Sequence, residues 1–271
     1  MARLVGAVLK LSAPETRGFW QIPVLWEDER LLALDKPSGL LTSPDRGDPQ
    51  RPSLMKLLQQ GIARNAPWAR ERRLTYLANA HRLDNETSGV LLLARDKPTL
   101  IALADQFGAE KAARTCVALI HGSPAENAFE VDARLAPHPA QPGLVRVDAR
   151  QGKKAKTLFE VEERFSGYTL LNCRPLTDRT HQIRAHLRHV GCPIVGDSLY
   201  GGRPLLLSRL KPEYRFKPGR EERALIGRVA LHAGQLNVAH PDSGAMIAVA
   251  APWPGDMMVA VKYLRRYAGG G

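Results

Sequence analysis

One stretch of the chain, residues 81–95 with the sequence HRLDNETSGVLLLAR, restricts the possible folds more than any other. The letters TSG favour a tight turn, and the five apolar residues after them predict a buried strand. Asp84 comes just before this turn, so the pattern predicts a carboxylate held in a loop against a buried strand. Such a carboxylate can be aimed at a substrate with little freedom to move. A loop carboxylate that caps a turn or pairs with Arg82 is the alternative interpretation.

The whole stretch resembles the catalytic motif of the RluA-type pseudouridine synthases, H-R-L-D-x-x-T-S-G-(L/V)-L-L-L-A, at nine or more specified positions. Further segments are similar to other motifs of this family and follow in the family's order: LDKPSGLLT from Leu34, GKKAKTLFEV from Gly152, PLTDRTHQIRAHLRHVGCPIVGDSLYG from Pro175, LHAGQLNVAHPDSG from Leu231 and APWPGDM from Ala251. Two positions depart from the family. Asp178 takes the place of a glycine, and Cys116 that of a tyrosine.

The resemblance implies which residues form the active site. By its position in the motif Asp84 is the nucleophile, and it attacks either C1′ of the ribose or C6 of the uracil. Arg184, the last residue of THQIR, is implied to lie within salt-bridge reach of Asp84, where a cation keeps a carboxylate ionised in a pocket that excludes water. Arg82 is implied to lie near the flipped nucleotide, and Cys116 to line the pocket. No cofactor is implied, because a carboxylate can form and release the covalent bond by itself.

The function implied by the resemblance is that of an enzyme, a pseudouridine synthase that isomerises uridine in ribosomal or transfer RNA. The uracil must first leave its stack, at a cost on the order of a few kcal/mol, which favours looped or distorted RNA as substrate. The alternative is a catalytically weak or inactive RNA-binding protein on the same fold, because Cys116 lacks the ring of the family tyrosine. A basic DNA-binding protein is a third interpretation, but no helix-turn-helix or zinc pattern supports it.

The fold implied by the resemblance is α+β: a long mixed, mostly antiparallel sheet with a central cleft and flanking helices. Residues 1–20 show no clear pattern and are expected to form an N-terminal extension. They are too few for the small S4-like RNA-binding domain that many relatives have. Residues 21–271 are expected to form the catalytic domain, since no linker long enough to force two domains appears.

Hydrophobic periodicity predicts individual elements along the chain. They are strands at 24–26 and 31–34, a helix opened by Pro52 and Ser53, a helix at 96–108, a strand at 114–120, a strand pair at 159–161 and 168–173, and a helix at 180–190. Thr177 or Asp178 is expected to cap the last helix. Two faces are expected on it: a core face of Ile183, Leu187 and Val190, and a second face of His181, Arg184 and Arg188.

The charge of the chain favours a polyanionic partner, since 39 Lys and Arg against 27 Asp and Glu give a net charge of +12. Arginines alternate with Trp68 and Tyr76 just ahead of residue 81, which suits RNA, because phosphates bind the charges and unstacked bases the rings. A solvated loop is the alternative. The residues expected to bind RNA are Arg64, Arg70, Arg72, Arg73, His181 and Arg188. The basic segment 203–228, with Tyr214 and Phe216, is a second candidate RNA arm.

Other function classes lack the motifs that they require. There is no G-x-x-x-x-G-K-[ST], G-x-S-x-G or H-E-x-x-H pattern, and the three histidines of residues 181–189 are spread around one helix, so no metal is expected. The three cysteines lack C-x-x-C spacing, and Cys173 and Cys192 are interpreted as idle thiols of a reducing cytoplasm. No segment approaches 18 uninterrupted apolar residues, so no membrane contact is expected. We expect a cytoplasmic monomer.

Overall fold

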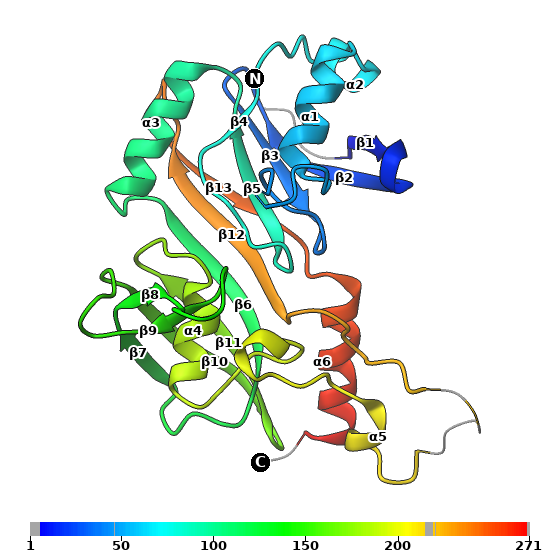
Figure 1. The fold of residues 1–271 in the computed structure, drawn as a ribbon, viewed down its shortest axis with the longest axis vertical. Helices are drawn as coiled ribbons and strands as arrows, with labels where there is room; N and C mark the ends of the chain where they lie inside the picture. The colour runs from blue at the N-terminus through cyan, green and yellow to red at the C-terminus, as the bar shows by residue number, and fades with distance from the viewer. Residues whose placement is uncertain (1–5, 46, 215–218, 220, 270–271) are drawn as a thin grey trace. The chain divides into compact units, whose positions relative to one another are not determined.

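The computed structural model describes residues 6–45, 47–214, 219 and 221–269. Its chain divides into two compact units. Unit 1 comprises Met1–Arg114 and Ala233–Pro252, and unit 2 comprises Thr115–His232 and Trp253–Gly271. Figure 1 labels the elements of both units.

The strands of unit 1 lie on both sides of one buried strand, β5 (Ser88–Ala94). They are β1 (Val8–Ala13), β2 (Gly18–Glu27), β3 (Leu31–Lys36), β4 (Ala78–Asn79), β5 (Ser88–Ala94), β12 (Leu231–Ala239) and β13 (Met246–Ala250), with a short 3-10 helix η1 (Pro14–Thr16) between the first two. β1 pairs with β2, β2 with β3 and β3 with β5, all antiparallel. β12 is the other neighbour of β5 and pairs with β13. Every residue of β5 is buried, as its apolar sequence predicts.

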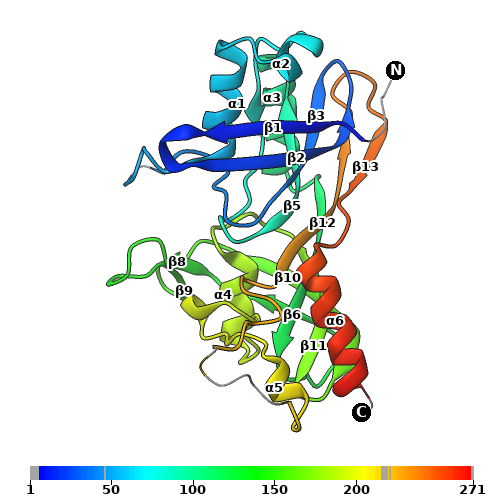
Figure 2. The same ribbon diagram turned by 90° about the vertical axis from the view of Figure 1, so that its right-hand side faces the viewer.

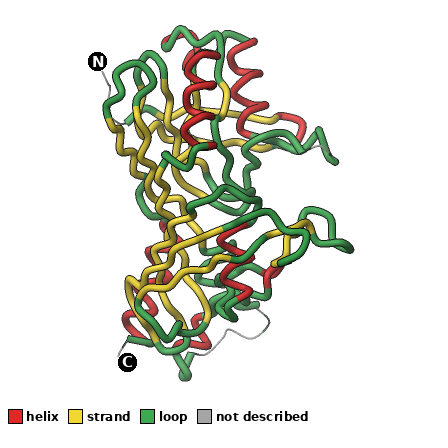
Figure 3. The backbone as a smooth tube through the Cα atoms, turned by 90° about the vertical axis from the view of Figure 1, so that its left-hand side faces the viewer, coloured by secondary structure: helices red, strands yellow, loops and turns green. Residues whose placement is uncertain are grey.

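Three helices complete unit 1: α1 (Leu54–Ala63), α2 (Pro67–Glu71) and α3 (Lys97–Gly108). Figure 3 shows their coils in red beside the yellow strands. Both longer helices have a side-chain cap, because Ser53 accepts a hydrogen bond from a backbone N–H at the start of α1 and Asp96 does so at the start of α3. Leu103 of α3 packs with Val90 and Leu92 of β5 in a core that also includes side chains of β3, β12 and β13.

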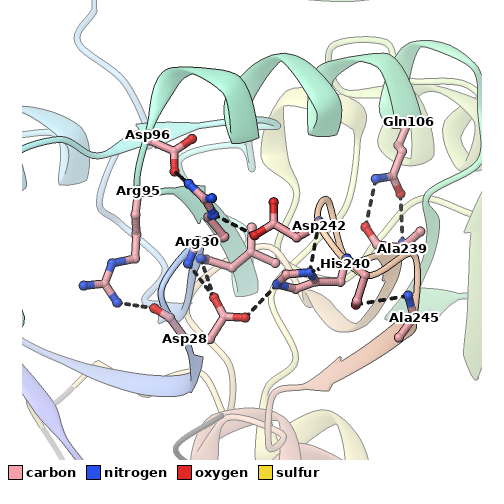
Figure 4. Close-up of polar contacts among 11 residues, drawn as sticks. Asp28, Arg30, Arg95, Asp96, Gln106, Ala239, His240, Asp242 and Ala245 are labelled. Carbon is pink, nitrogen blue, oxygen red and sulfur yellow. Dashed lines mark hydrogen bonds and ion pairs between the residues drawn. The ribbon is translucent and has the colours of Figure 1, made fainter. Parts of the chain in front are cut away.

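A polar cluster around Asp28 fixes the turn between β2 and β3 (Figure 4). One carboxylate oxygen of Asp28 accepts hydrogen bonds from two backbone N–H groups of the turn, and the other contacts His240 Nε2 at 2.8 Å. Arg30 forms ion pairs with Asp96 at the start of α3 and with Asp242 between β12 and β13. Three connections of unit 1 are therefore held together at one place.

Unit 2 contains a second antiparallel set of strands. They are β6 (Ala113–His121), β7 (Ala128–Asp132), β10 (Lys156–Phe165) and β11 (Tyr168–Pro175), in the order β6-β11-β10-β7. The hairpin of β8 (Leu135–Pro137) and β9 (Val145–Val147) is separate. The remaining elements are α4 (Gln182–His189), the 3-10 helix η2 (Ser198–Tyr200), α5 (Leu207–Leu210) and α6 (Gly255–Tyr267). α5 and α6 lie side by side (Figures 1 and 2).

The start of α4 differs from the prediction. The helix begins at Gln182, because His181 before it has a left-handed backbone with φ 51°. Neither Thr177 nor Asp178 caps it, since no side chain makes a capping bond there. The hydroxyl of Thr177 instead donates to Gln182 Oε1 at 2.7 Å.

The end of α4 also corrects the predicted core face. Ile183 and Leu187 are 7% and 0% exposed, as expected, but Val190 is 40% exposed. The last helical residue is His189, and Gly191 with φ 75° turns the chain away. Val190 therefore follows the helix and does not continue its apolar face.

The predicted α+β fold class and the predicted strands and helices are confirmed. The central cleft and the domain boundary at residue 20 stay predictions, although β1 places a paired strand inside residues 1–20, where the sequence showed no pattern. Among the described residues, no helix is long and apolar enough to cross a membrane.

Candidate active site

The turn that contains Asp84 is built as the sequence predicts. Asp84 is half-buried and Arg82 is exposed. The backbone N–H of Thr87 donates to the carbonyl oxygen of Asp84 at 3.2 Å, which closes the turn. The buried strand β5 begins at the next residue. The carboxylate of Asp84 therefore stands at the start of an immobilised strand.

The segment LDKPSGLLT binds the backbone of this turn. Thr42 is buried, and its Oγ1 donates to the carbonyl oxygen of Leu83 at 2.8 Å and accepts from the N–H of Leu83 at 3.2 Å. One hydroxyl thus satisfies both backbone groups of the residue that precedes Asp84. A buried backbone group without a hydrogen-bond partner costs free energy. The contact with Thr42 therefore fixes the backbone just before Asp84.

Two more bonds hold the residues that follow Asp84. Ser38 Oγ donates to the carbonyl oxygen of Glu86 at 2.7 Å. The N–H of Gly39 donates to the carbonyl oxygen of Asn85 at 2.8 Å. The backbone on both sides of Asp84 is therefore bound to one segment of the chain.

Lys36 stabilises that segment from inside. Its side chain is fully buried, and its ammonium donates to the carbonyl oxygens of Pro37 at 2.8 Å, Leu40 at 2.7 Å and Asn85 at 3.4 Å. A buried ammonium is tolerated only where hydrogen bonds replace its hydration. The lysine of the first motif therefore links its own loop to the turn of Asp84.

His81, the first residue of the catalytic motif, supports the turn from β5. It is 5% exposed, and its Nε2 accepts a hydrogen bond from the N–H of Leu92 at 3.0 Å. β4 pairs with the last two residues of β5, so the ring takes the place of the next β4 residue. Because Nε2 accepts, the neutral ring has its proton on Nδ1. Burial, and secondarily the charge of Arg114, lowers the pKa of His81 to about 3.

Gly89, the glycine of the TSG turn, occupies a position where a side chain would not fit. Its φ of 119° is unfavourable for other residues. A Cβ at this position would overlap the carbonyl oxygen of Ala233 in β12. The glycine therefore allows β5 and β12 to approach closely.

In unit 2, Arg184 is held in one orientation. Arg184 and Asp197 are each 1% exposed, and Nε and Nη2 of the arginine donate to the two carboxylate oxygens at 2.7 and 2.8 Å. The guanidinium lies over the ring of Tyr200, with Cζ 5.0 Å from its centroid. Bidentate pairing fixes the plane of the guanidinium as well as its position. The ion pair between Asp84 of unit 1 and Arg184 stays a prediction.

Gln182 attaches the start of α4 to β10. Its Oε1 accepts from the hydroxyl of Thr177 at 2.7 Å and the N–H of Arg179 at 3.1 Å. Its Nε2 donates to the carbonyl oxygen of Lys156 and to Thr157 Oγ1, both at 3.0 Å. The glutamine of the THQIR motif therefore positions the helix that contains Arg184.

His186 has a structural role. Its Nδ1 lies 2.9 Å from Thr157 Oγ1 and its Nε2 lies 2.9 Å from the carbonyl oxygen of Ala133. Burial lowers the pKa of His186. Within the residues that the structure describes, no group of three or more His, Cys, Asp or Glu could hold a metal ion.

His181 and Arg188 lie at the two ends of α4. His181 adopts the left-handed backbone that is uncommon for residues other than glycine, and its Nδ1 lies 3.0 Å from the hydroxyl of Tyr200. Arg188 is exposed one turn beyond Arg184. Asp178, in place of the family glycine, is absent from the described residues with positive φ, so its backbone does not need a glycine.

Cys116 lies on β6 and is 6% exposed. It is directly opposite Cys173 of β11 in the antiparallel register, and the two cysteines do not form a disulfide. Burial, followed by the nearby Cys116, raises the pKa of the Cys173 thiol. The position of the family tyrosine is therefore occupied by one member of a facing thiol pair.

The arginines ahead of His81 do not all point to solvent. Arg64, Arg70 and Arg73 are exposed. Arg72 is not, because its Nε forms an ion pair with Glu27 at 2.7 Å, with the two side chains 13% and 14% exposed. Arg72 therefore holds α2 to β2. That its side chain contacts RNA stays a prediction, and the ion pair with Glu27 argues against it.

The two aromatic residues of the same segment also differ in exposure. Trp68 is 8% exposed and occupies the space that a side chain at Gly61 would need, so it belongs to the core and is not placed to stack on a base. Tyr76 is half-buried. In the second candidate arm Tyr214 is described, whereas Phe216 lies outside the described residues.

Comparison with known proteins decides the family. The RNA pseudouridylate synthase family model matches residues 30–189. The chain is 37% identical over 250 residues to the ribosomal large subunit pseudouridine synthase D of Xanthomonas campestris, which covers 89% of this chain and 69% of that protein. Ribosomal large subunit pseudouridine synthase C of Escherichia coli is 33% identical over 244 residues, 89% of this chain and 70% of the relative. The chain belongs to the RluA-type pseudouridine synthase family.

The fold agrees with this assignment. The human RNA pseudouridylate synthase domain containing 4 superposes with a TM-score of 0.66 at 22% identity, covering 89% of this chain and 92% of that one. The predicted family, the pseudouridine synthase fold and the enzyme class are confirmed. This RluA-type synthase is an isomerase that acts on uridine in RNA.

Several residues that support the site were not singled out from the sequence. They are Lys36, Thr42, His81, Thr157, Gln182, Asp197 and Tyr200. Each lies inside a segment that resembles a family motif. A polar residue among buried neighbours in such a segment is the signal that would have identified them.

Proposed function

We propose that this RluA-type synthase converts uridine to pseudouridine in ribosomal RNA, with Asp84 as the nucleophile. The observation that supports this most is the set of hydrogen bonds from LDKPSGLLT to the turn of Asp84. A carboxylate that attacks carbon must be held in place while the substrate is brought to it. Two relatives named for the large ribosomal subunit favour ribosomal RNA over transfer RNA.

The chemistry needs no added group. The carboxylate of Asp84 attacks C1′ of the ribose or C6 of the uracil, and the covalent bond is broken again after the base has turned. The bond from C1′ to N1 is replaced by a bond from C1′ to C5. The hydrogen on C5 is lost as a proton and N1 gains one, so the atoms of uridine and pseudouridine balance.

Arg184 serves to keep the attacking carboxylate ionised. The bidentate bond to Asp197 and the packing on Tyr200 support this role, because they turn a long flexible side chain into an oriented cation. An oriented positive charge favours the carboxylate form without protein rearrangement during the reaction.

Exposed cations bind the RNA around the reacting uridine. Arg82, which is exposed two residues before Asp84, contacts the flipped nucleotide in this proposal. The other exposed or half-buried cationic residues that we propose as RNA contacts are Arg64, Arg70, Arg73, His181 and Arg188. Their contribution is electrostatic and should fall steeply with salt.

The test replaces Asp84 with Asn, which has the same shape and cannot form the ester. The substrate is ribosomal RNA labelled with tritium at C5 of uridine, taken from a strain that lacks this protein. We expect Asp84→Asn to retain RNA affinity and to release no tritium, while the exposed α3 control Asp105→Asn keeps wild-type activity. Turnover by Asp84→Asn above a few per cent of wild type would remove Asp84 from the nucleophile role.

The departure at Cys116 supports a second candidate, a weak or inactive RNA-binding protein. A thiol offers no ring for stacking on uracil, and the loss of an aromatic contact costs about 1–3 kcal/mol per base. We propose an active enzyme, slower than one with the tyrosine, so Cys116→Tyr should preserve or raise turnover. No pseudouridine from wild type, together with a gain in Cys116→Tyr, would favour the second candidate.

Cys116, Cys173 and Cys192 form no disulfide, which fits a reducing compartment. We therefore place the enzyme in the cytoplasm and expect it to act as a monomer.

A further inference from the structure

A cavity of about 550 Å³ lies in unit 2, outside the residues proposed for catalysis. Its walls are the β8–β9 hairpin, the last turn of α4 and η2. The lining includes His138, Leu144, Arg146, Arg188, His189 and Leu199, together with Tyr200 of η2. Its volume falls in the range of about 300–1,000 Å³ that is typical of small-ligand sites.

The lining of this cavity is cationic. It contains two arginines and two histidines and no acidic residue. Arg188 is exposed, and its side chain makes no hydrogen bond or ion pair among the described residues, so its guanidinium donors remain for a ligand. Arg146 has one ion pair, to Asp148 at 2.9 Å, with 46% of its side chain exposed. Two arginines in the lining of one hollow suit a phosphate, because a phosphate accepts the paired donors of a guanidinium group.

The same cavity has an apolar side. Leu199 is 57% exposed, although large apolar side chains are usually covered. It stands with Leu144 on the wall formed by η2 and the hairpin. A ligand that combines an anionic group with a flat, weakly polar ring would use both sides, and a nucleotide has this composition.

Tyr200 connects the cavity with the helix of Arg184. Its hydroxyl accepts a hydrogen bond from the N–H of Val145 at 3.1 Å and contacts His181 Nδ1 at 3.0 Å. Its ring lies under the guanidinium of Arg184. Arg188 follows Arg184 by four residues, one helical turn or about 6 Å along the axis. A chain that reaches Arg184 can therefore reach the cavity within a few nucleotides.

We propose that this cavity binds a nucleotide of the substrate RNA that is not the reacting uridine. Arg188 and Arg146 bind its phosphate, and Leu199 and Leu144 contact its base or ribose. The inference rests on the proposed function, since it takes RNA as the substrate. It adds a subsite that selects RNA by the position of a second unstacked nucleotide near the target.

The experiment measures single-turnover pseudouridine formation against enzyme concentration, with ribosomal RNA from a strain that lacks this protein. The fit gives an apparent Kd and a limiting rate. A charge-assisted hydrogen bond contributes about 1.5–3 kcal/mol, so Arg188→Gln should raise the apparent Kd by at least about tenfold, with most of the effect on Kd and not on the limiting rate. Arg146→Gln should act in the same direction.

Two further variants separate phosphate binding from overall charge. Arg188→Lys keeps the charge and loses the paired donors, so it should restore the salt dependence but only part of the affinity. Arg266→Gln removes the same charge from α6, away from the cavity lining, and should leave Kd unchanged. For Arg188→Gln, the slope of log K against log salt should fall by about one.

The outcomes distinguish this proposal from the proposed function. Pseudouridine formation with an unchanged Kd and salt slope in Arg188→Gln would overturn the cavity and leave the function intact. A lower limiting rate at unchanged Kd would overturn it as well, because Arg188 would then act on the reaction. If wild type forms no pseudouridine, the proposed function fails, and filter binding of the same RNA to wild type and Arg188→Gln decides the cavity.

Discussion

Thr42 and Leu83 exchange two hydrogen bonds although 41 residues separate them in the sequence. The first motif of the family thus binds the second, and the hydroxyl of Thr42 is one of the groups that join them. We expect Thr42→Val, which has nearly the same shape, to leave two buried backbone groups unpaired and to lower the free energy of unfolding by about 1–3 kcal/mol. Urea unfolding and tritium release should both show the loss. Thr42→Ser retains the hydroxyl, and an equal loss in that variant would contradict this explanation.

The ion pair of Arg184 and Asp197 should behave as a buried one. Asp197→Ala leaves a guanidinium that is 1% exposed without its partner, and breaking such a pair costs about 3–5 kcal/mol. We expect a loss of this size in the free energy of unfolding, measured by urea denaturation. The control is Glu163→Ala, which breaks the surface pair with Arg265 and should change stability by less than about 1 kcal/mol. Similar values for the two variants would refute the assigned role of burial.

The protonation of His81 should make stability depend on pH. Its pKa is lowered to about 3 in the folded chain from an ordinary value of 6.5, so the unfolded chain binds one more proton between these values. The contribution of neutral His81 to the free energy of unfolding is complete above pH 6.5. It is lost as the pH falls toward 3, and the free energy of unfolding then decreases by up to about 1.4 kcal/mol per pH unit. His81→Gln should remove this slope from unfolding curves recorded between pH 4 and 7. A wild-type curve with the same slope as the variant would show that another group titrates.

The exposed arginines ahead of His81 should contribute to RNA affinity without affecting stability. We expect the triple variant Arg64→Glu, Arg70→Glu, Arg73→Glu to bind ribosomal RNA more weakly and with a shallower salt dependence. Its thermal unfolding should match wild type. Arg72→Glu is the contrasting variant, since it should lower stability through the lost pair with Glu27. Unchanged RNA affinity in the triple variant would move the arm to the segment 203–228.

Local patterns predict the elements whose cause is local. The helices that begin after Ser53 and after Asp96 and the apolar run of β5 depend on adjacent residues, and all appear in the structure as expected. The motifs were sufficient for the family and for most of the residues proposed in the site.

Contacts between distant residues explain what the sequence alone did not provide. Trp68 was expected to take a base, but it fills a space that exists only because Gly61 on α1 has no side chain. Arg72 was expected to bind RNA, but it pairs with Glu27, 45 residues earlier. In each case the local sequence was compatible with both outcomes, and tertiary packing determined which one occurred.

The ammonium of Lys36 and the hydroxyls of Ser38 and Thr42 bind backbone carbonyl oxygens on both sides of Asp84 and so restrain the turn that contains it. Under the proposed mechanism the acid cannot travel toward a uridine that is slightly misplaced. Reorganisation before the reaction then falls mainly on the nucleic acid, so we expect a uridine already turned out of its helix to be a better substrate than a stacked one. The enzyme then selects its target uridine by how easily the surrounding RNA can be deformed, because the loop of Asp84 is restrained.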